Sequence, residues 1–389
     1  MNLRGKRVLL RVDWNVPLTG GIRPAESLKI ERSLKTITML TRRGAVVIVL
    51  THLGRPDKPD PHFSTQHLVS LLEQEYHLPI QFHPNAIGEK KSCLLLGERL
   101  KEADAGSVHL LENVRFEKGE EKNDARLAKA YATVGQLFIN DAFASSHRAH
   151  VSVVGIAKYL PGYAGPCLQA EVAFMQRLLV KPKQPFICII GGLKLSTKIP
   201  VLHALLKRCD NVCIGGAMAT PFLKARGFSI GASVMEAKTS SLAKQLLSQK
   251  NIVIPIDVVV TEHVSPRPKL RTVLVEDIAS RDIIVDIGPR TLLLWGKMIR
   301  QAKTVLWNGP IGMVEIPSCG AGSRFIARTL ARRPRNVAFT VAGGGDTLPV
   351  IMETHTQDHI GHVSTGGGAL LEFLTSRGQL PGILPFIKH

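Results

Sequence analysis

Two lysines, Lys194 and Lys198, follow an apolar run and a pair of glycines in FICIIGGLKLSTK, residues 186–198. The run is typical of a buried strand, and a glycine turn that leads into a helix lets backbone amides approach a phosphate. The segment is not a GxxxxGK[ST] phosphate loop, because its glycines are adjacent and lie just before the first lysine. The four-residue spacing places both lysines on one face if a helix has begun by Lys194. The segment predicts contact with phosphate groups.

Four more glycine-rich segments follow strand-like runs in the second half of the chain. They are GGAMA (215–219), NGPIG (308–312), AGGGDT (342–347) and STGGGA (364–369). One such loop is more often a plain turn between a strand and a helix, but five in one half favour nucleotide phosphates. Asp346 follows the glycines of AGGGDT, where its carboxylate is placed to meet a magnesium ion bound to phosphates.

The first half of the chain carries basic and polar side chains at the corresponding places. The segments are RVDWN (11–15), THLGR (51–55), ENVRF (112–116) and NDAFASSHRAH (140–150). Ligands of open parallel sheets bind beyond the carboxyl ends of the strands, so these side chains predict a site for a highly anionic ligand. An anion site in one half and glycine loops in the other indicate phosphoryl transfer between two bound substrates, in which positioning and positive charge do most of the catalysis.

Short apolar runs that alternate with helical patterns position these residues. Strands are expected at 8–12, 45–50, 108–111, 136–140, 185–190, 211–214, 251–256, 303–307 and 336–341, and helices include 68–76, 125–134, 199–207 and 324–331. The alternation predicts an α/β fold with parallel sheets in βαβ units. At 389 residues the chain is long for one core, so two domains are expected. Turn formers in LPGYAGP (160–166) and KPKQP (181–185) bound a helix that joins them.

The formal net charge of +19 is spread along the chain without a basic tail or block, and aromatic residues make up 5%. An anionic small-molecule substrate or a charged surface therefore explains it better than nucleic acid does. The six cysteines form no CxxC pair, which favours buried free thiols in a reducing compartment. The N-terminal segment reads as a strand rather than a signal peptide, and no apolar run has the length of a membrane span, so we expect a cytoplasmic protein.

Eight motifs resemble those of phosphoglycerate kinases, in the order of that family. They are RVDWNVP, HLGRP, LLENVRF, NDAFASSHRAH, GGLKLSTK, WNGPIG, GGGDT and HVSTGGGALLEFL. The resemblance implies two Rossmann-like three-layer domains joined by a helix and a hinge. It implies an N-terminal domain at 1–165 that binds 3-phosphoglycerate, with a tail at 376–389 that packs back on it, a helix at 166–184 and a nucleotide-binding domain at 185–375. It also implies a cytoplasmic monomer that uses magnesium with ADP or ATP.

The resemblance also assigns residues to the reaction 1,3-bisphosphoglycerate + ADP ⇌ 3-phosphoglycerate + ATP. It implies that the sugar-acid site consists of Asp13, Asn15, Lys29, His52, Arg55, Arg115 and Arg148. The implied catalytic residues are Lys29, Lys194 and Lys198. The implied nucleotide site consists of Lys198, Ile284, Glu315, Gly344, Gly345, Asp346 and Thr347, with Asp346 at the metal.

Several of these positions depart from the family pattern. Lys29 stands where the family has an arginine, and the loss of the planar fork predicts reduced turnover unless Arg23 or Arg32 compensates. Leu193, Ala217 and Ile284 stand around the expected adenine slot, where the family keeps small residues. They predict weaker nucleotide binding or an altered preference.

Other clusters have simpler interpretations. His355, His359 and His362 have metal-like spacing, but no nearby cysteine or acidic residue completes a site, and His147 with His150 are expected to support the anion site. Trp14 is expected to be a core aromatic residue. Three functions remain open: an active phosphoglycerate kinase, which we favour, a divergent member with weak activity or another phosphorylated substrate, and a basic protein that binds nucleic acid or another polyanion on the same fold.

Overall fold

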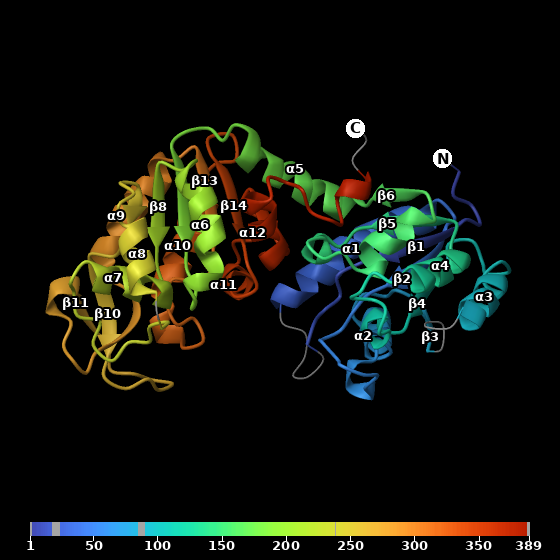
Figure 1. The fold of residues 1–389 in the computed structure, drawn as a ribbon, viewed down its shortest axis with the longest axis horizontal. Helices are drawn as coiled ribbons and strands as arrows, with labels where there is room; N and C mark the ends of the chain where they lie inside the picture. The colour runs from blue at the N-terminus through green and yellow to red at the C-terminus, as the bar shows by residue number, and fades with distance from the viewer. Residues whose placement is uncertain (1, 18–23, 85–89, 238, 387–389) are drawn as a thin grey trace. The chain divides into compact units, whose positions relative to one another are not determined.

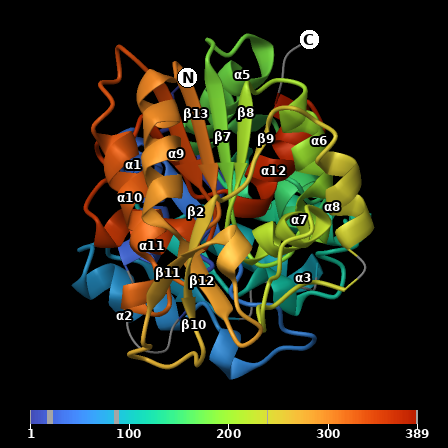
Figure 2. The ribbon, with the colours of Figure 1, turned by 90° about the vertical axis from the view of Figure 1, so that its left-hand side faces the viewer.

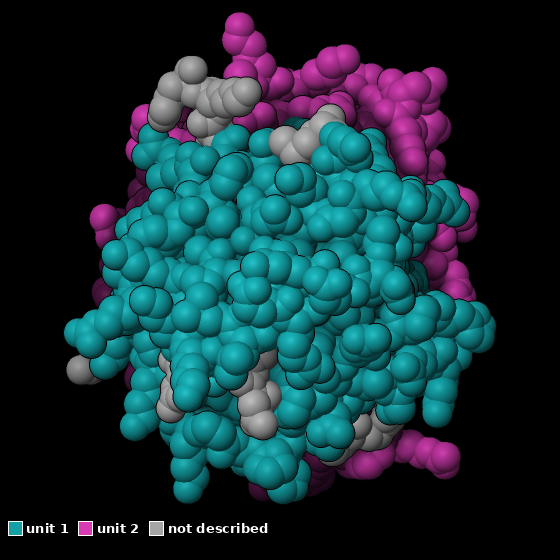
Figure 3. All heavy atoms as spheres, turned by 90° about the vertical axis from the view of Figure 1, so that its right-hand side faces the viewer, with its two compact units in different colours: residues 1–173, 378–389 teal, residues 174–377 magenta. Residues whose placement is uncertain are grey.

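A computed structural model of the chain describes residues 2–17, 24–84, 90–237 and 239–386. These residues divide into two compact units, coloured separately in Figure 3. Unit 1 runs to Ala173 and takes up the chain again from Gly378, and unit 2 comprises Phe174–Arg377. The division falls inside the helix α5 (Pro166–Val180).

Unit 1 is built on a six-stranded parallel sheet of order β3-β4-β2-β1-β5-β6. Its strands are β1 (Arg7–Arg11), β2 (Val46–Leu50), β3 (Gln81–His83), β4 (Val108–Leu111), β5 (Leu137–Asn140) and β6 (Gly162–Ala164). Its helices besides the first half of α5 are α1 (Pro24–Arg42), α2 (His67–Gln74), α3 (Lys90–Arg99) and α4 (Ala125–Val134).

Side chains of this sheet alternate between two cores, one on each face. Leu10 and Val47 pack with residues of α1 and α2, whereas Leu9 and Ile48 pack with residues of α3 and α4. Buried strands with both faces covered are the expected form of parallel βαβ units. Trp14 is fully buried in the first core and its indole donates to Ser33 Oγ at 2.6 Å, which confirms that it is a core residue.

Unit 2 contains a second six-stranded parallel sheet, of order β15-β14-β13-β7-β8-β9 (Figures 1 and 2). Its strands are β7 (Phe186–Ile190), β8 (Asn211–Ile214), β9 (Ile252–Val253), β13 (Thr304–Asn308), β14 (Phe339–Gly343) and β15 (His362–Ser364). Its helices are α6 (Ile199–Leu206), α7 (Thr220–Ala225), α8 (Ser240–Leu246), α9 (Pro289–Gln301), α10 (Ala321–Ala331), α11 (Thr347–Glu353) and α12 (Gly367–Thr375). Figure 2 shows α9, α10 and α11 on one face and α6, α8 and α12 on the other.

The two parallel sheets confirm the predicted α/β fold, and most strands begin and end within two or three residues of the expected positions. The strand expected at 251–256 is shorter, because only Ile252–Val253 pairs with β8 before Pro255. An antiparallel sheet of order β11-β10-β12, formed by β10 (Asp257–Thr261), β11 (Arg271–Leu274) and β12 (Ile283–Ile287), did not emerge from the sequence.

The last described residues belong to unit 1. The Gly382 amide donates to Ser146 O at 2.8 Å, and Asn140 Nδ2 donates to Gly382 O at 2.8 Å. The rings of Phe386 and Phe138 lie 6.1 Å apart. The apolar tail is therefore held against the loop that follows β5.

Candidate functional site

The strand ends of unit 1 bring the predicted anion-site residues together. β1, β2, β4 and β5 are parallel, so the segments that follow them meet at one edge of the sheet. Asn15 Oδ1 accepts the Gly54 amide at 2.8 Å, and Arg115 Nη1 donates to Gly54 O at 3.0 Å. Gly54 has φ of 60°, and a Cβ there would overlap the Phe63 ring, so this close junction requires glycine.

Lys29 reaches the same edge from the second turn of α1. Its Nζ lies 3.5 Å from the Asp13 carboxylate and donates to Asn15 O at 3.2 Å. Arg32 is directed elsewhere, because its guanidinium pairs with Glu171 at 3.4 Å. Arg23 lies outside the described residues. The structure therefore provides no arginine fork from Arg32 in place of Lys29.

Arg11, which our sequence reasoning did not single out, is buried beneath this edge. Its Nη2 donates to His52 Nδ1 at 2.9 Å and its Nε donates to Ser152 Oγ at 2.9 Å. A guanidinium has donors only, so His52 Nδ1 must be an acceptor and the proton of a neutral imidazole must sit on Nε2. Burial, together with the charges of Arg11 and Arg115, holds the pKa of His52 well below its usual value. His52 thus presents a neutral N–H donor, and its tautomer is fixed.

A buried carboxylate lies behind Arg11. Ser152 Oγ donates to Glu120 Oε1 at 2.5 Å and the Ser152 amide donates to Oε2 at 3.1 Å, so the serine connects Glu120 with Arg11. Burial raises the pKa of Glu120 to about 7, although the hydrogen bonds from Ser152 and the charge of Arg11 act in the opposite direction. His150 Nδ1 lies 4.0 Å from Glu120, and burial lowers the pKa of His150 to about 4.

The arginines of this edge lie within electrostatic reach of one another. Burial and the charge of Arg148 lower the pKa of Arg115, and Arg55 and Arg11 contribute in the same sense. Arg55 is exposed, while Arg148 is half-buried and its Nε lies 3.2 Å from His147 Nε2. Like charges held together in a partly buried place favour a ligand of opposite sign. Asp13, Asn15, Lys29, His52 and the three arginines thus form an edge suited to a multiply charged anion.

At the corresponding edge of unit 2, a hydrogen bond fixes the side chain of Lys198. Its Nζ donates to Asn308 Oδ1 at 2.7 Å, and Asn308 Nδ2 donates to Gly343 O at 2.8 Å. Burial lowers the pKa of Lys198 while the charge of Asp346 raises it, so the two side chains interact electrostatically. Gly344 has φ of 122° and a Cβ there would lie 3.0 Å from Asn308 and from Thr347, so the loop after β14 requires glycine.

Both lysines precede α6, which begins at Ile199. Ser196–Lys198 form a 3₁₀ turn, and the Glu236 carboxylate accepts the Ser196 amide at 2.9 Å. The condition for placing Lys194 and Lys198 on one face of a helix is therefore not met. Lys194 is exposed in the loop, whereas Lys198 is half-buried at its end.

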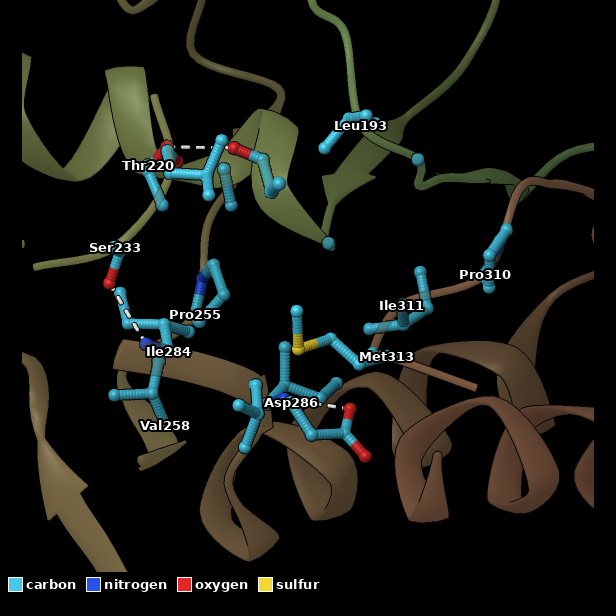
Figure 4. Close-up of a pocket in the computed structure, with 18 of the residues that line it drawn as sticks. Leu193, Thr220, Ser233, Pro255, Val258, Ile284, Asp286, Pro310, Ile311 and Met313 are labelled. Atoms are coloured by element: carbon cyan, nitrogen blue, oxygen red, sulfur yellow. Dashed lines mark hydrogen bonds between the residues drawn. The ribbon is translucent and has the colours of Figure 1, made fainter. Parts of the chain in front are cut away.

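An apolar cavity of about 320 Å³ adjoins these loops. Its lining includes Leu193, Ala217, Ile284, Met313, Glu315 and Asp346. Figure 4 shows Leu193 and Ile284 on different walls, with Met313 reaching toward the space between them. Leu193 is 61% exposed, so it stands at the rim, while the half-buried Ile284 is fixed by its amide, which donates to Ser233 Oγ at 2.8 Å. The cavity has the size and the apolar lining of a small-molecule site.

Asp286 also lines this cavity, but its carboxylate faces a helix. It accepts the Gly322 amide at 2.8 Å near the start of α10. Burial raises the pKa of Asp286 to about 7 against the effect of these backbone donors. We assign Asp286 to holding α10 rather than to the ligand.

Three of the remaining predicted residues follow β14 at this edge. Gly345 and Asp346 are exposed, and Thr347 is buried with its Oγ1 accepting the Gly309 amide at 2.8 Å. His362 stacks on Phe174 with ring centroids 4.2 Å apart. Within the described residues no three histidine, cysteine, aspartate or glutamate side chains are grouped so as to hold a metal, and no helix is long and apolar enough to cross a membrane.

Sequence reasoning missed Arg11, Glu120 and Asn308. Arg11 carried a usable signal, because a charge between Leu10 and Val12 in an otherwise apolar strand must find buried partners. Asn308 is the first residue of the NGPIG segment. The glycines of that segment predicted a loop, but they did not predict that the side-chain amide of Asn308 would accept a hydrogen bond from Lys198. Nothing near Glu120 in the sequence distinguishes it from Glu121, the exposed acid beside it.

The comparisons with known proteins cover nearly the whole chain. A family model described as phosphoglycerate kinase matches residues 1–377. The phosphoglycerate kinase of one strain of Thermus thermophilus is 43% identical over 389 residues, 98% of this chain and 96% of the relative. That of Thermosipho africanus is 40% identical over 390 residues, 98% of this chain and 95% of the relative.

Solved structures agree. The phosphoglycerate kinase of Coxiella burnetii is 36% identical, with a TM-score of 0.82 over 99% of this chain and 96% of that one. That of Pyrococcus horikoshii OT3 is 29% identical, with a TM-score of 0.86 over the same shares.

Proposed function

The chain belongs to the phosphoglycerate kinase family, and from this premise we propose how its residues divide the work of the reaction. The reaction is the reversible transfer of a phosphoryl group from 1,3-bisphosphoglycerate to ADP, which gives 3-phosphoglycerate and ATP. We assign the sugar acid to the cationic edge of unit 1 and the nucleotide to the loops and cavity of unit 2. The observation that carries the second assignment is the contact between Lys198 and Asn308, because Lys198 interacts electrostatically with Asp346, which lines the apolar cavity.

In unit 1 the side chains bind and orient. Arg55, Arg115 and Arg148 offer forked donors to phosphate and carboxylate oxygens, and His52 adds a single neutral N–H from Nε2. In the direction from ATP to 3-phosphoglycerate, the carboxylate that receives the phosphoryl group is ionised at pH 7, so its attack needs no general base. Lys29 supplies positive charge without a fork.

In unit 2 the backbone loops receive the nucleotide phosphates. Lys198 is held by Asn308 toward these phosphates, and the exposed Lys194 is free to follow the group in transfer. We assign Gly344, Gly345 and Thr347 to the loop that receives the phosphates, and Glu315, which lines the cavity, to the ribose. Charge stabilisation of this kind accounts for most of the catalysis in phosphoryl transfer.

The residues present fit a magnesium ion that arrives with the nucleotide. Magnesium prefers oxygen ligands and is commonly held by one or two carboxylates together with substrate phosphates. Asp346 offers an exposed carboxylate beside Lys198, and no larger cage of acidic side chains occurs among the described residues. Bound there, the ion would neutralise phosphate charge.

A coupled assay of ATP formation from 1,3-bisphosphoglycerate, ADP and magnesium tests the assignment. The assignment is supported if the turnover number is comparable to that of other family members and if substitution of Arg115 or of Lys198 abolishes turnover. Slow turnover would favour the divergent member, and salt-sensitive nucleic-acid binding without turnover would favour the polyanion-binding protein.

We also propose that the cavity lining weakens nucleotide binding. The side chains of Ile284 and Leu193 take up space in a cavity of about 320 Å³, which is near the lower end of small-molecule sites. Ile284→Gly should lower KM for ADP about tenfold, since even one methylene more or less in an apolar pocket is worth about 1–3 kcal/mol. KM values for ADP and GDP should be compared with those of Leu293→Ala, an exposed control on α9. Unchanged values for Ile284→Gly would contradict this proposal.

For the state of the protein we propose a cytoplasmic monomer. All six cysteines are free, as expected in a reducing compartment, and five of them are buried. Light scattering on the protein as it elutes from a size-exclusion column should give a mass near 42.5 kDa, the mass of one chain. A mass twice that value would contradict it.

A further inference from the structure

A second hollow of unit 2 lies at the other end of its large sheet. It measures about 310 Å³ and is formed by the end of α5, residues 181–183 after it, and the beginnings of β13 and β14. β7, β13 and β14 are parallel and in register, so the nucleotide loops lie about 16 Å away at the opposite strand ends. Figures 1 and 2 show α5 at one end of this sheet and the small sheet of β10–β12 toward the other.

Five cations line this hollow, and no acidic residue does: they are Arg177, Lys181, Lys183, Lys303 and Arg335. All five are exposed, and no carboxylate of the described residues forms an ion pair with them. The guanidinium of Arg335 donates to two backbone carbonyl oxygens. One belongs to Asp358, and the other, at 3.4 Å, belongs to Ile360. A concave surface with uncompensated charge of one sign concentrates counter-ions.

Two arginines of the hollow are held in place. The Arg177 guanidinium lies over the Phe339 ring at 3.9 Å from its centroid, and Arg335 is tethered by the carbonyls after α11. Ordered guanidinium groups lose less freedom on binding and present planar forks to phosphate oxygens. The three lysines add flexible point charges around them.

From these observations we propose that the hollow is a second anion site, which takes a short chain of two or more phosphate groups. Five cations exceed what a single phosphate would neutralise, and the volume suits a small molecule. Nucleic acid fits less well, because single strands are held by exposed aromatic faces. The aromatic ring of this hollow, Phe339, is covered by Arg177 and stacks on Phe174 at 6.0 Å. The site accounts for part of the +19 charge that the catalytic sites leave unexplained.

Calorimetric titration with inorganic tripolyphosphate tests the proposal, with ADP and 3-phosphoglycerate in excess to occupy the catalytic sites. The test variant is Lys181→Gln/Lys183→Gln/Lys303→Gln. Its control, Lys244→Gln/Lys250→Gln/Lys297→Gln, removes the same charge from exposed lysines elsewhere in unit 2. We expect the test variant to bind about tenfold or more weakly and the control to stay within about twofold, because only nearby charges act strongly at physiological salt. Turnover should be unchanged in both.

A footprint locates the bound anion. Tripolyphosphate should protect Lys181, Lys183 and Lys303 from acetylation but leave Lys244 unprotected, and inorganic phosphate should protect them only at about tenfold higher concentration. Three results would overturn the proposal. The first is an equal loss of affinity in the two variants, and the second is tighter binding of a single-stranded oligonucleotide than of tripolyphosphate. The third is that tripolyphosphate does not bind at all, in which case the cations would serve to offset the negative carbonyl end of α5.

Discussion

The two units form their proposed binding sites from different kinds of groups. Each has a six-stranded parallel sheet, and the residues that we propose for binding follow its strand ends. Unit 1 uses charged side chains, one of which, Arg11, is buried within the unit, whereas unit 2 uses backbone loops, an apolar cavity and the exposed Lys194. A site made from buried charges is part of the core that supports it. We therefore expect substitutions to disturb folding and function together in unit 1 and to separate them in unit 2.

The largest effect should follow Arg11→Met. It leaves His52, Ser152 and Glu120 without their buried cation, and breaking such a network by removing one partner costs about 3–5 kcal/mol. Hydrogen exchange resolved by peptide should show lost protection in unit 1 and unchanged protection in unit 2. Arg55→Met, at an exposed arginine of the same edge, is the control for folding. Equal protection of unit 1 in both variants would refute the difference between the units.

Lys198→Ala should lower kcat by about 10²–10³ with a small change in the free energy of unfolding. The loss corresponds to about 2.7–4 kcal/mol of charge stabilisation, as for removal of one preorganised donor. The folded state loses one hydrogen bond, to Asn308, which contributes about 1 kcal/mol. Steady-state kinetics and urea unfolding should be compared with Lys207→Ala, an exposed lysine after α6. A decrease in the free energy of unfolding as large as the increase in activation free energy would contradict the expectation.

Lys29→Arg should raise turnover. An arginine fork can add a charge-assisted bond worth about 1–3 kcal/mol, and Arg32 does not supply it because it pairs with Glu171. We expect kcat to rise about tenfold, with Lys35→Arg on the same helix unchanged. An unchanged or lower rate would show that Lys29, which contacts Asp13 and Asn15 O, is already sufficient.

Acid should weaken unit 1 through its buried histidines. His83 Nε2 and His109 Nδ1 lie 3.0 Å apart, and burial lowers the pKa of His109 to about 4 and that of His83 in the same direction. In the unfolded chain His109 is protonated below about pH 6.5, whereas in the folded protein its pKa is about 4. Protonation therefore favours the unfolded chain, and the free energy of unfolding falls as the pH falls from about 6.5 to about 4.

Between pH 7 and pH 5 the loss from His109 should be about 1–2 kcal/mol. Urea unfolding at both pH values should show this difference in the parent and a smaller one in His109→Gln. Glu120 and Asp286, whose pKa values are raised, act in the opposite sense but equally in both proteins. The same pH dependence in parent and variant would exclude His109 as its source.

The sequence predicts the strand ends well because glycine and arginine mark them directly. It locates Lys198 and the loop at Gly344, where φ of 122° selects glycine. It does not reveal the partners that fix these groups, such as Asn308 for Lys198, because they come from strands about 110 residues away. The small antiparallel sheet is missed for a related reason: its strands are short, and β10 and β12 are separated by the turn-rich segment that contains β11.

The hydrogen bonds between Gly382 and the loop after β5 bear on the order of folding during synthesis. Unit 1 is completed by residues that leave the ribosome about 200 residues after its first part, whereas unit 2 is one continuous stretch. At about 5–20 residues per second the first part waits about 10–40 s for its last segment. Unit 2 therefore needs no segment from outside its own stretch, whereas unit 1 needs a segment that is made after unit 2.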